Sequence, residues 1–258
     1  MVIVSLTTTP PNMFALAGSI DRLLSSQTTP PDLVVVNVCS NYSRFNSENL
    51  SISLESISDK VIINPCVDSG PATKLLGLFE SDKVHIGDDD VIIIIDDDHS
   101  YPSYMVEEYL NTFDLIKNDH KTVLGVVGSP MVSLGTQSEK LPVGLTEWTE
   151  ARNSNLKKVS VLQGWGSYSM KGSAFKKLKE VYAIHHFPNP VFYHDDLFIS
   201  NIMNKHFDLR IVQTEKLWHH RAVRDHSKID SPWVSESNRE LRSNNDSPQV
   251  TQMHNDVS

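Results

Sequence analysis

Apolar positions along the chain follow two patterns, short continuous runs and longer mixed stretches. The runs are rich in β-branched residues, which favours strands that are covered on both faces. They span residues 2–6, 33–38, 61–63, 91–95, 123–127 and 209–212. The mixed stretches favour helices, through apolar residues at helical spacing or a proline in the first turn. They span residues 13–24, 71–79, 107–117, 173–182 and 195–204. Strands alternating with helices predict an α/β domain with a mostly parallel central sheet and helices on both faces.

One domain is expected over residues 1–230. From about Ser231 the chain becomes polar and rich in serine and asparagine, so residues 231–258 are expected to form a C-terminal tail that is partly disordered. No repeat with a period of about 20 to 50 residues is found, which argues against a solenoid.

Composition and charge narrow the class of protein. Hydrophobic residues make up 39% of the 258 residues, enough for a real core. The net charge of −9 argues against a nucleic-acid partner, which requires a basic face. The longest apolar run is far shorter than the roughly 20 residues of a membrane-spanning helix, and the N-terminus lacks a signal-peptide pattern. We therefore expect a cytoplasmic protein without a membrane span.

Cys39 and Cys66 could pair in a disulfide, but two buried thiols are the simpler interpretation.

The clearest chemical signal is an acidic triplet, Asp96, Asp97 and Asp98, directly after the run 91–95. In an open α/β sheet, ligands bind beyond the carboxyl ends of the strands. Crowded carboxylates repel one another, and a divalent cation such as Mg²⁺ or Mn²⁺ removes that penalty. Alternate residues of an extended segment point the same way, so Asp96 and Asp98 should share one side. A solvated acidic turn is the alternative.

A second acidic triplet, residues 88–90, precedes the same strand. It should therefore lie at the opposite end of the sheet. We expect a charged surface loop there, without a ligand.

Two turns are compatible with ligand binding. Asp68 and Lys74 flank a Gly-Pro turn that opens a helix, where free N–H groups could meet an anion. Lys74 could reach a phosphate or pair with Asp68, although a structural helix start explains the segment equally well. Gly164, Trp165 and Gly166 place an indole, which can stack on a sugar or a base, between two small residues. A core tryptophan beside two turn glycines is the alternative.

Two pairs of adjacent ionisable residues lie in the last third of the sequence. Asp195 and Asp196 open a predicted helix, where they could be caps, but a carboxylate on an anchored helix also suits a general base. Successive helical residues point about 100° apart, so one acid could face a site while the other caps. His219 or His220 could complete a metal site built on carboxylates, and a surface histidine pair is the alternative.

Together these motifs, in this order and spacing, resemble a GT-A-type glycosyltransferase, an enzyme that uses a nucleoside-diphosphate sugar. The opening strand and the compact length are most similar to the small transferases of large algal viruses (chlorovirus-like). The resemblance covers roughly residues 1–222. It is carried by Ser5–Pro10, Gly70-Pro71-Ala72-x-Lys74, Asp96–Asp98, Gly164–Ser167, Asp195-Asp196 and the late histidine.

The resemblance implies a single GT-A (Rossmann-like) domain that transfers a sugar from a nucleoside-diphosphate donor to a hydroxyl of a glycan acceptor, with Mn²⁺ or Mg²⁺ as cofactor. The donor it implies first is a UDP-sugar. It implies inversion with Asp196 as the base beside Asp195, and host cytoplasm as the location if the protein is viral. The implied metal ligands are Asp98 and Asp96 with His219 or His220. The implied nucleotide and sugar contacts lie at strand ends and turns: Thr7, Thr9, Asn37, Asp68, Lys74, Asp96, Asp97, Gly164, Trp165 and Gly166.

Three other classes remain open. A phosphatase of the haloacid-dehalogenase type would use Asp96 as a nucleophile, but a small hydroxyl residue usually follows that motif, whereas His99 follows here. A sugar nucleotidyltransferase would use the triplet for Mg²⁺ and release pyrophosphate. A non-catalytic sugar- or nucleotide-binding module requires Asp195 and Asp196 to be only caps.

Overall fold

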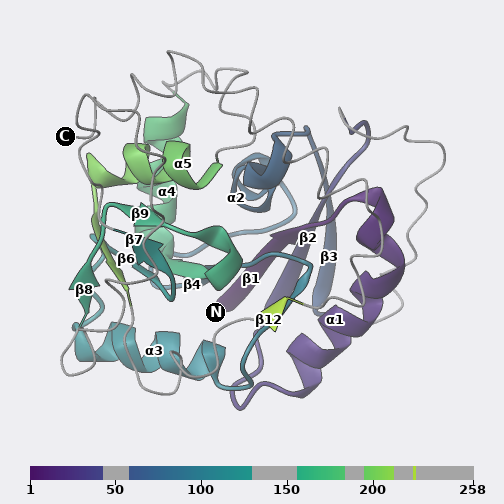
Figure 1. The fold of residues 1–258 in the computed structure, drawn as a ribbon, viewed down its shortest axis with the longest axis horizontal. Helices are drawn as coiled ribbons and strands as arrows, with labels where there is room; N and C mark the ends of the chain where they lie inside the picture. The colour runs from purple at the N-terminus through teal and green to yellow at the C-terminus, as the bar shows by residue number, and fades with distance from the viewer. Residues whose placement is uncertain (43–57, 130–155, 184–194, 212–222, 225–258) are drawn as a thin grey trace, which may run out of the picture.

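The computed structural model describes residues 1–42, 58–129, 156–183, 195–211 and 223–224 (Figure 1). Within these residues an eight-stranded sheet forms the centre of the molecule. In spatial order it contains β3 (Val61–Cys66), β2 (Leu33–Cys39), β1 (Val2–Thr7), β4 (Val91–Ile94), β10 (Tyr168–Lys171), β6 (Thr122–Gly125), β11 (Asp208–Ile211) and β8 (Lys157–Lys158). β10 and β8 run antiparallel to their neighbours and the other strands run parallel to one another, so the predicted mostly parallel sheet is confirmed.

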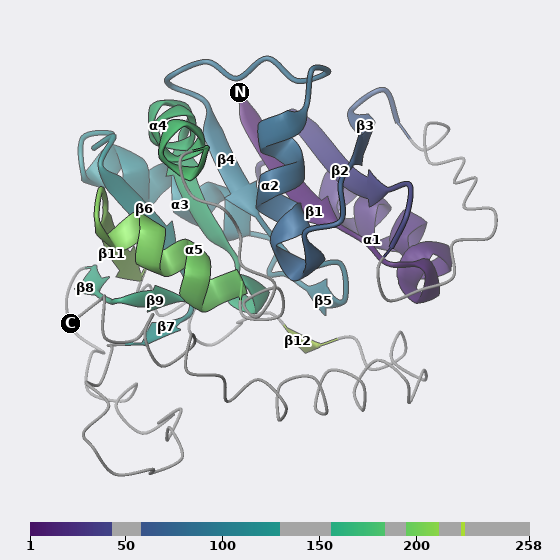
Figure 2. The ribbon, with the colours of Figure 1, turned by 90° about the horizontal axis from the view of Figure 1, so that it is seen from above.

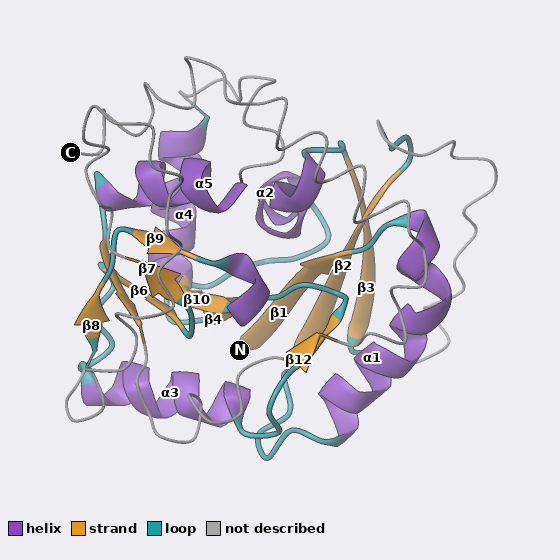
Figure 3. Cartoon of the chain, in the orientation of Figure 1, coloured by secondary structure: helices purple, strands orange, loops and turns teal. Residues whose placement is uncertain are grey.

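Helices cover both faces of the sheet, as predicted (Figure 3). α1 (Met13–Ser25) and α3 (Met105–Leu115) lie on one face, and α2 (Thr73–Glu80), α4 (Gly172–Tyr182) and α5 (Asp195–Asn204) lie on the other. The side chains of β4 show why the run 91–95 is continuous. Ile92 and Ile94 pack with α2, α4 and α5, whereas Ile93 packs with α1 and α3, and all three are fully buried. A strand with apolar layers on both sides has no polar face.

The main difference from the predicted elements is β10. Its sequence, Tyr-Ser-Met-Lys, lacks a β-branched run, so the apolar pattern does not reveal it. It nevertheless lies between β4 and β6 and pairs Tyr168 with Ile94. Because β10 is antiparallel to β4, its first residue lies at the carboxyl end of β4. The 3-10 turn η4 (Gly164–Gly166) that precedes β10 is thereby brought to the acidic triplet.

Short elements complete the described chain. Two more 3-10 turns, η1 (Pro10–Asn12) and η2 (Gly70–Ala72), precede α1 and α2. β5 (His99–Ser100) pairs with β12 (Val223–Arg224), and β7 (Gly128–Ser129) pairs with β9 (Val161–Leu162). Seen from above in Figure 2, β5 and the starts of α2 and α5 lie at the same edge of the sheet.

Several predictions fall outside the described residues. These are the polar tail 231–258, the end of the domain near residue 230, and both late histidines, His219 and His220. In the part of the chain that the structure describes, no helix has the length and apolar character needed to cross a membrane.

Gly172, the first residue of α4, packs against the turn before β4. A Cβ at this position would lie 1.8 Å from the carbonyl oxygen of Gly87. We expect Gly172→Ala to lower the free energy of unfolding by roughly 2 kcal/mol or more, because backbone atoms cannot move aside as a side chain can. The control is Gly18→Ala in α1, where a Cβ would meet no atom within 4 Å. Urea denaturation of both variants tests the contact, and equal stabilities would contradict it.

Candidate active site

The acidic triplet lies at the carboxyl end of β4, as predicted. Asp96 and Asp98 come together with His99, the first residue of β5, and each offers a ligand atom within 4.8 Å of the other two. The Nδ1 atom of His99 lies 2.6 Å from Oδ1 of Asp98. All three side chains are partly exposed. Two carboxylates and an imidazole form a donor set that fits a divalent metal.

His99 is a candidate metal ligand that the sequence motifs did not single out. It is the residue directly after the triplet, and imidazole is a common metal ligand, so its type and place were the available signal. A turn at Asp97 and Asp98 leads directly into β5, so His99 follows the acids at once. The residues predicted to supply the imidazole, His219 and His220, lie outside the described residues.

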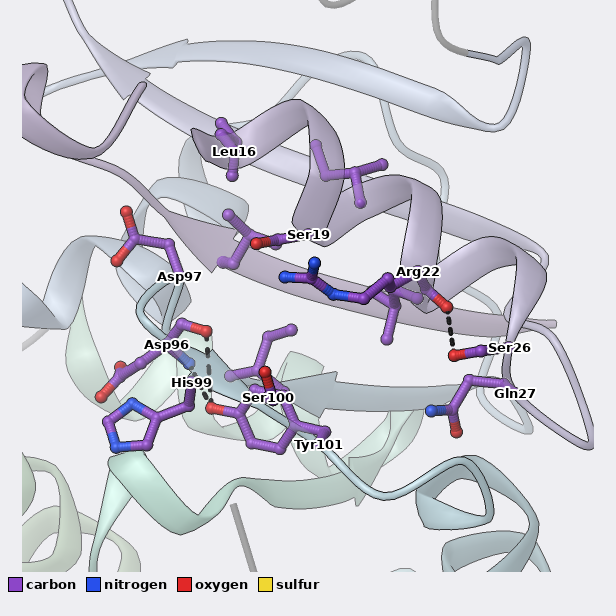
Figure 4. A pocket seen from close by; sticks show the side chains of 14 residues that line it. Leu16, Ser19, Arg22, Ser26, Gln27, Asp96, Asp97, His99, Ser100 and Tyr101 are labelled. Carbon is purple, nitrogen blue, oxygen red and sulfur yellow. Dashed lines mark hydrogen bonds between the residues drawn. The ribbon is translucent and has the colours of Figure 1, made fainter. Parts of the chain in front are cut away.

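Asp97 points away from Asp96, as the alternation predicts (Figure 4). Its carboxylate accepts hydrogen bonds from Thr8 Oγ1 at 2.6 Å and from Asn12 Nδ2 at 3.2 Å. Burial, with added repulsion from Asp98 and Asp96, raises the pKa of Asp97 from 3.8 to about 7. Asp97 therefore ties the turn after β1 to the acidic turn. The contact with a nucleotide implied by the resemblance stays a prediction.

Lys74 connects the acidic turn to α5. Its side chain is only 3% exposed, and its Nζ atom lies 2.7 Å from Oδ1 of Asp96 and 3.2 Å from Oδ2 of Asp195. Burial lowers the pKa of Lys74, but the charges of Asp195, Asp96 and Asp196 outweigh burial and raise it well above its usual value. Lys74 is therefore a buried cation surrounded by carboxylates.

The partner of Lys74 is not Asp68, which was one of the two expectations. Oδ1 of Asp68 instead accepts a hydrogen bond of 2.9 Å from the N–H of Gly70 and shapes the turn before α2. Gly70 has a φ of 63°, a conformation that glycine adopts without strain. The predicted contacts of Asp68 with the base and of Lys74 with phosphates stay predictions.

The two acids at the start of α5 divide their roles. Asp195 is buried and faces Lys74. Asp196 accepts a hydrogen bond of 2.8 Å from the N–H of Gly164. Burial and the adjacent charge of Asp195 raise the pKa of Asp196 from 3.8 to about 7. Since Asp195 is bound to a lysine and Asp196 to a turn on another element, both carboxylates bind across the site rather than cap only their own helix.

A side chain at Gly164 would displace the charged ends of two other side chains. A Cβ at Gly164 would lie 2.3 Å from Lys74 Nζ and 3.0 Å from Asp196 Oδ1. Both charged groups therefore lie against the same backbone position. The predicted turn at Gly164–Gly166 is thus part of the site, although its contact with a sugar remains a prediction.

Two aromatic side chains border the candidate metal ligands Asp96, Asp98 and His99. The ring of Trp165 lies 5.9 Å from that of His99, centroid to centroid, and its Nε1–H donates to Gln163 at 2.7 Å. The hydroxyl of Tyr101 accepts a hydrogen bond of 2.8 Å from the N–H of Asp96 and donates to the carbonyl oxygen of Trp165 at 3.3 Å. Tyr101 therefore fixes the acidic turn to η4. In Figure 4 it lies with Asp96 and His99 beside a hollow under α1.

The residues expected at the end of β1 lie near the triplet. Thr7 Oγ1 donates to the carbonyl oxygen of Asn37 at 3.0 Å. The carbonyl oxygen of Thr9 accepts the N–H of Asn12 at 2.8 Å and closes η1. Both threonines are partly exposed, so they stay candidates for a ligand contact.

Asn37 requires a correction. Its side chain is fully buried, its Nδ2 donates to Ser5 Oγ and to the carbonyl oxygen of Leu6, both at 2.9 Å, and its Oδ1 accepts from Asn64 at 2.8 Å. An amide enclosed in this way cannot bind a nucleotide from solution. Asn37 instead joins β1, β2 and β3 beneath the site.

The second acidic triplet lies at the other end of β4, as predicted. Asp88 and Asp89 are exposed, but Asp90 is only 8% exposed and accepts the N–H of Gly87 at 2.7 Å. The expectation of a purely surface loop is therefore wrong for Asp90, which stabilises the turn.

Comparison of the sequence with models of protein families and with curated proteins gives no match. Comparison of the structure with solved structures gives matches. TarS 1–349 from S. aureus, in complex with UDP, has a TM-score of 0.50 at 13% identity, over 82% of this chain and 57% of that one. The mannosyltransferase PcManGT from Pyrobaculum calidifontis, in complex with GDP-Man and Mn²⁺, has a TM-score of 0.49 at 14% identity, over 82% of this chain and 56% of that one. A 4-diphosphocytidyl-2C-methyl-D-erythritol synthase from Anaerococcus prevotii has a TM-score of 0.49 at 12% identity, over 84% of this chain and 92% of that one.

The similarity to TarS shows the fold: the chain is a GT-A-like, Rossmann-like α/β domain. This chain spans little more than half, 57%, of TarS 1–349. The similarity to transferases of algal viruses is not tested by these matches and stays a prediction.

Removal of Lys74 tests the charge network. We expect Lys74→Met to lower the free energy of unfolding at neutral pH by about 3–5 kcal/mol, because Asp195 and Asp96 would lose a buried partner. Lys176→Met is a matched control, since it removes an exposed ion pair with Asp88 at 2.6 Å and should change stability little. Urea denaturation measures both. A Lys74→Met protein as stable as the control would mean that Lys74 does not hold the acidic elements together.

Proposed function

We propose that this chain is a metal-dependent glycosyltransferase that moves a sugar from a nucleoside-diphosphate donor to a hydroxyl of a glycan acceptor. The observation that supports the proposal is the meeting of two acidic elements at Lys74. The acidic turn reaches Lys74 through Asp96, and α5 reaches it through Asp195. One group of acids can then hold a cation while another, on the opposite element, serves as a base.

Asp96, Asp98 and His99 are the residues that would hold the metal. An imidazole beside two carboxylates favours a transition metal such as Mn²⁺ over Mg²⁺, which prefers oxygen ligands. When bound, the cation would supply positive charge to a diphosphate leaving group. UDP is the first nucleotide to test, because TarS has the same fold and was solved with UDP.

Asp196 is the proposed general base. The N–H of Gly164 fixes one of its carboxylate oxygens, which orients the side chain from another element. A pKa of about 7 suits a group that takes a proton from an acceptor hydroxyl near neutral pH. Asp195, which is held by Lys74, positions the start of α5. A base on the far side of the sugar from the leaving group gives inversion at the anomeric carbon.

A thermal-shift screen of nucleotide sugars with and without Mn²⁺ identifies the donor, because a ligand that binds the folded chain raises its Tm. The product then separates the reaction classes. A glycosyltransferase releases a nucleoside diphosphate from the donor, whereas a nucleotidyltransferase releases pyrophosphate and a phosphatase releases phosphate from simple esters. Either of the last two products, without nucleoside diphosphate, would contradict the proposal.

Asp98→Ala should abolish Mn²⁺-dependent binding of the donor, because it removes one of the three metal ligands. Asp89→Ala is the matched control, since it removes an exposed acid from the triplet at the opposite end of β4. Titration calorimetry with and without Mn²⁺ measures both variants. Unchanged Mn²⁺ binding by Asp98→Ala would place the metal elsewhere.

Asp196→Asn should reduce turnover by about 100-fold or more while leaving donor binding near normal, because it removes the base but keeps the size of the side chain. In the unmodified protein, turnover should rise with pH and level off above the pKa of Asp196, about 7, because only the ionised carboxylate accepts a proton. Release of nucleoside diphosphate across a pH series measures this. A full rate in Asp196→Asn would exclude Asp196 as the base.

A further inference from the structure

Two cysteines lie side by side at the carboxyl edge of the sheet. Cys39 ends β2, Cys66 ends β3, and the two are register partners in the parallel pair. Both are free thiols, and their Sγ atoms are 3.9 Å apart. Neighbouring strands are about 4.7–4.9 Å apart, within the roughly 4.4–6.8 Å that separates the Cα atoms of disulfide-bonded cysteines. The backbone spacing therefore already suits a disulfide, and the sulfur atoms need to approach by only about 2 Å.

The two thiols differ in access to solvent. Cys39 is 1% exposed and packs with Met13 and Tyr42, whereas Cys66 is partly exposed. A small oxidant can therefore reach Cys66 first. Cys39 is then the nearest group that can react with a modified Cys66.

We propose that Cys39 and Cys66 are a redox-active dithiol that closes to an intramolecular disulfide when it meets a low-molecular-weight disulfide such as glutathione disulfide. The Cys66 thiol loses its proton and its sulfur attacks one sulfur of the oxidant, which releases one thiolate. The Cys39 thiol then loses its proton, attacks the Cys66 sulfur of the mixed disulfide and releases the second thiolate. The two protein thiols lose two electrons, and the oxidant gains them. The two protons pass to the released thiolates.

The contact between the sulfurs also lowers the fraction of Cys66 that is present as thiolate. The hydrogen bond with Cys39 and the burial of the thiol raise the pKa of Cys66. Since the thiolate is the attacking species, oxidation is slow at neutral pH and accelerates as the pH rises.

A chain of hydrogen bonds connects the dithiol to the acidic turn. The N–H of Cys39 donates to Tyr42 Oη at 3.2 Å, and the Tyr42 hydroxyl donates to the carbonyl oxygen of Thr8 at 2.9 Å. The Thr8 hydroxyl donates to Asp97 at 2.6 Å. Closure of the disulfide draws Cys39 toward Cys66, at the start of this series of hydrogen bonds. The oxidised protein therefore binds Mn²⁺ at Asp96, Asp98 and His99 with altered affinity, a consequence that rests on the proposed function.

The disulfide itself is tested without any assay of activity. The full chain is incubated with glutathione disulfide at pH 7 and pH 9, and free thiols and intact mass are followed. Closure removes both thiols and the mass of two hydrogen atoms, yields a peptide that joins Cys39 to Cys66, proceeds faster at pH 9 and raises the Tm by roughly 5 °C or more. Cys66→Ser is the control, which cannot close and keeps Cys39 reduced. Wild-type protein that keeps both thiols, or that stops at the mixed disulfide, overturns the proposal.

The link to the acidic turn is measured by titration of Mn²⁺ into reduced and oxidised chain. We expect the Kd to change about fivefold or more, and Cys66→Ser treated with the oxidant to keep the value of the reduced chain. An equal Kd in both forms of the wild type overturns the link while the disulfide result stands. No Mn²⁺ binding in either form, by contrast, overturns both the proposed function and the link that rests on it, and again leaves the disulfide result intact.

Discussion

The buried ammonium group of Lys74 is the interaction on which the site depends. A charged group taken out of water is unfavourable unless partners surround it. Here the partners come from two elements that are far apart in the sequence, Asp96 after β4 and Asp195 at the start of α5. Asp195 and Lys74 are both buried, so each needs the other as a partner, whereas Asp96 is partly exposed. The two ion pairs fix α5 against the carboxyl edge of the sheet.

The antiparallel strand β10 supplies the second constraint. It runs against β4, so that the turn leading into it is at the edge where β4 ends. Gly164 in that turn has no side chain, and Lys74 and Asp196 occupy the space a Cβ would need. A parallel strand at this position would bring its end, not its beginning, to the acidic turn. The direction of the four-residue strand β10 therefore brings the turn at Gly164 to Lys74 and to the acids at the start of α5.

Local sequence patterns predicted the parallel strands of the sheet and the position of the acidic turn at the site. The run 91–95 predicted a strand buried on both faces, and the acids after it predicted its functional edge, because both features depend on neighbouring residues. β10 was missed because its four residues show no apolar run, and its pairing with β4 is a tertiary contact. Asn37 was misjudged for the same reason, since only the packing of β3 and α2 around it shows that its amide is enclosed. His99 was recognisable by residue type, but the contact of its Nδ1 atom with Asp98 depends on the conformation of the turn.

The raised pKa values at the site link its chemistry to the stability of the fold. Burial raises the pKa of Asp97 and of Asp196 from 3.8 to about 7. An acid with a higher pKa in the folded chain stabilises the fold most below its unfolded pKa, and this contribution is lost as the pH rises through the folded value. Above pH 7 the site therefore contains ionised carboxylates that destabilise one another, held together by the sheet and by Lys74. A divalent cation at Asp96, Asp98 and His99 would remove part of that repulsion, so its binding would also stabilise the fold. Ionisation of Asp196 adds negative charge near Asp96, so the edge of the sheet favours a cation more strongly as the pH rises through about 7.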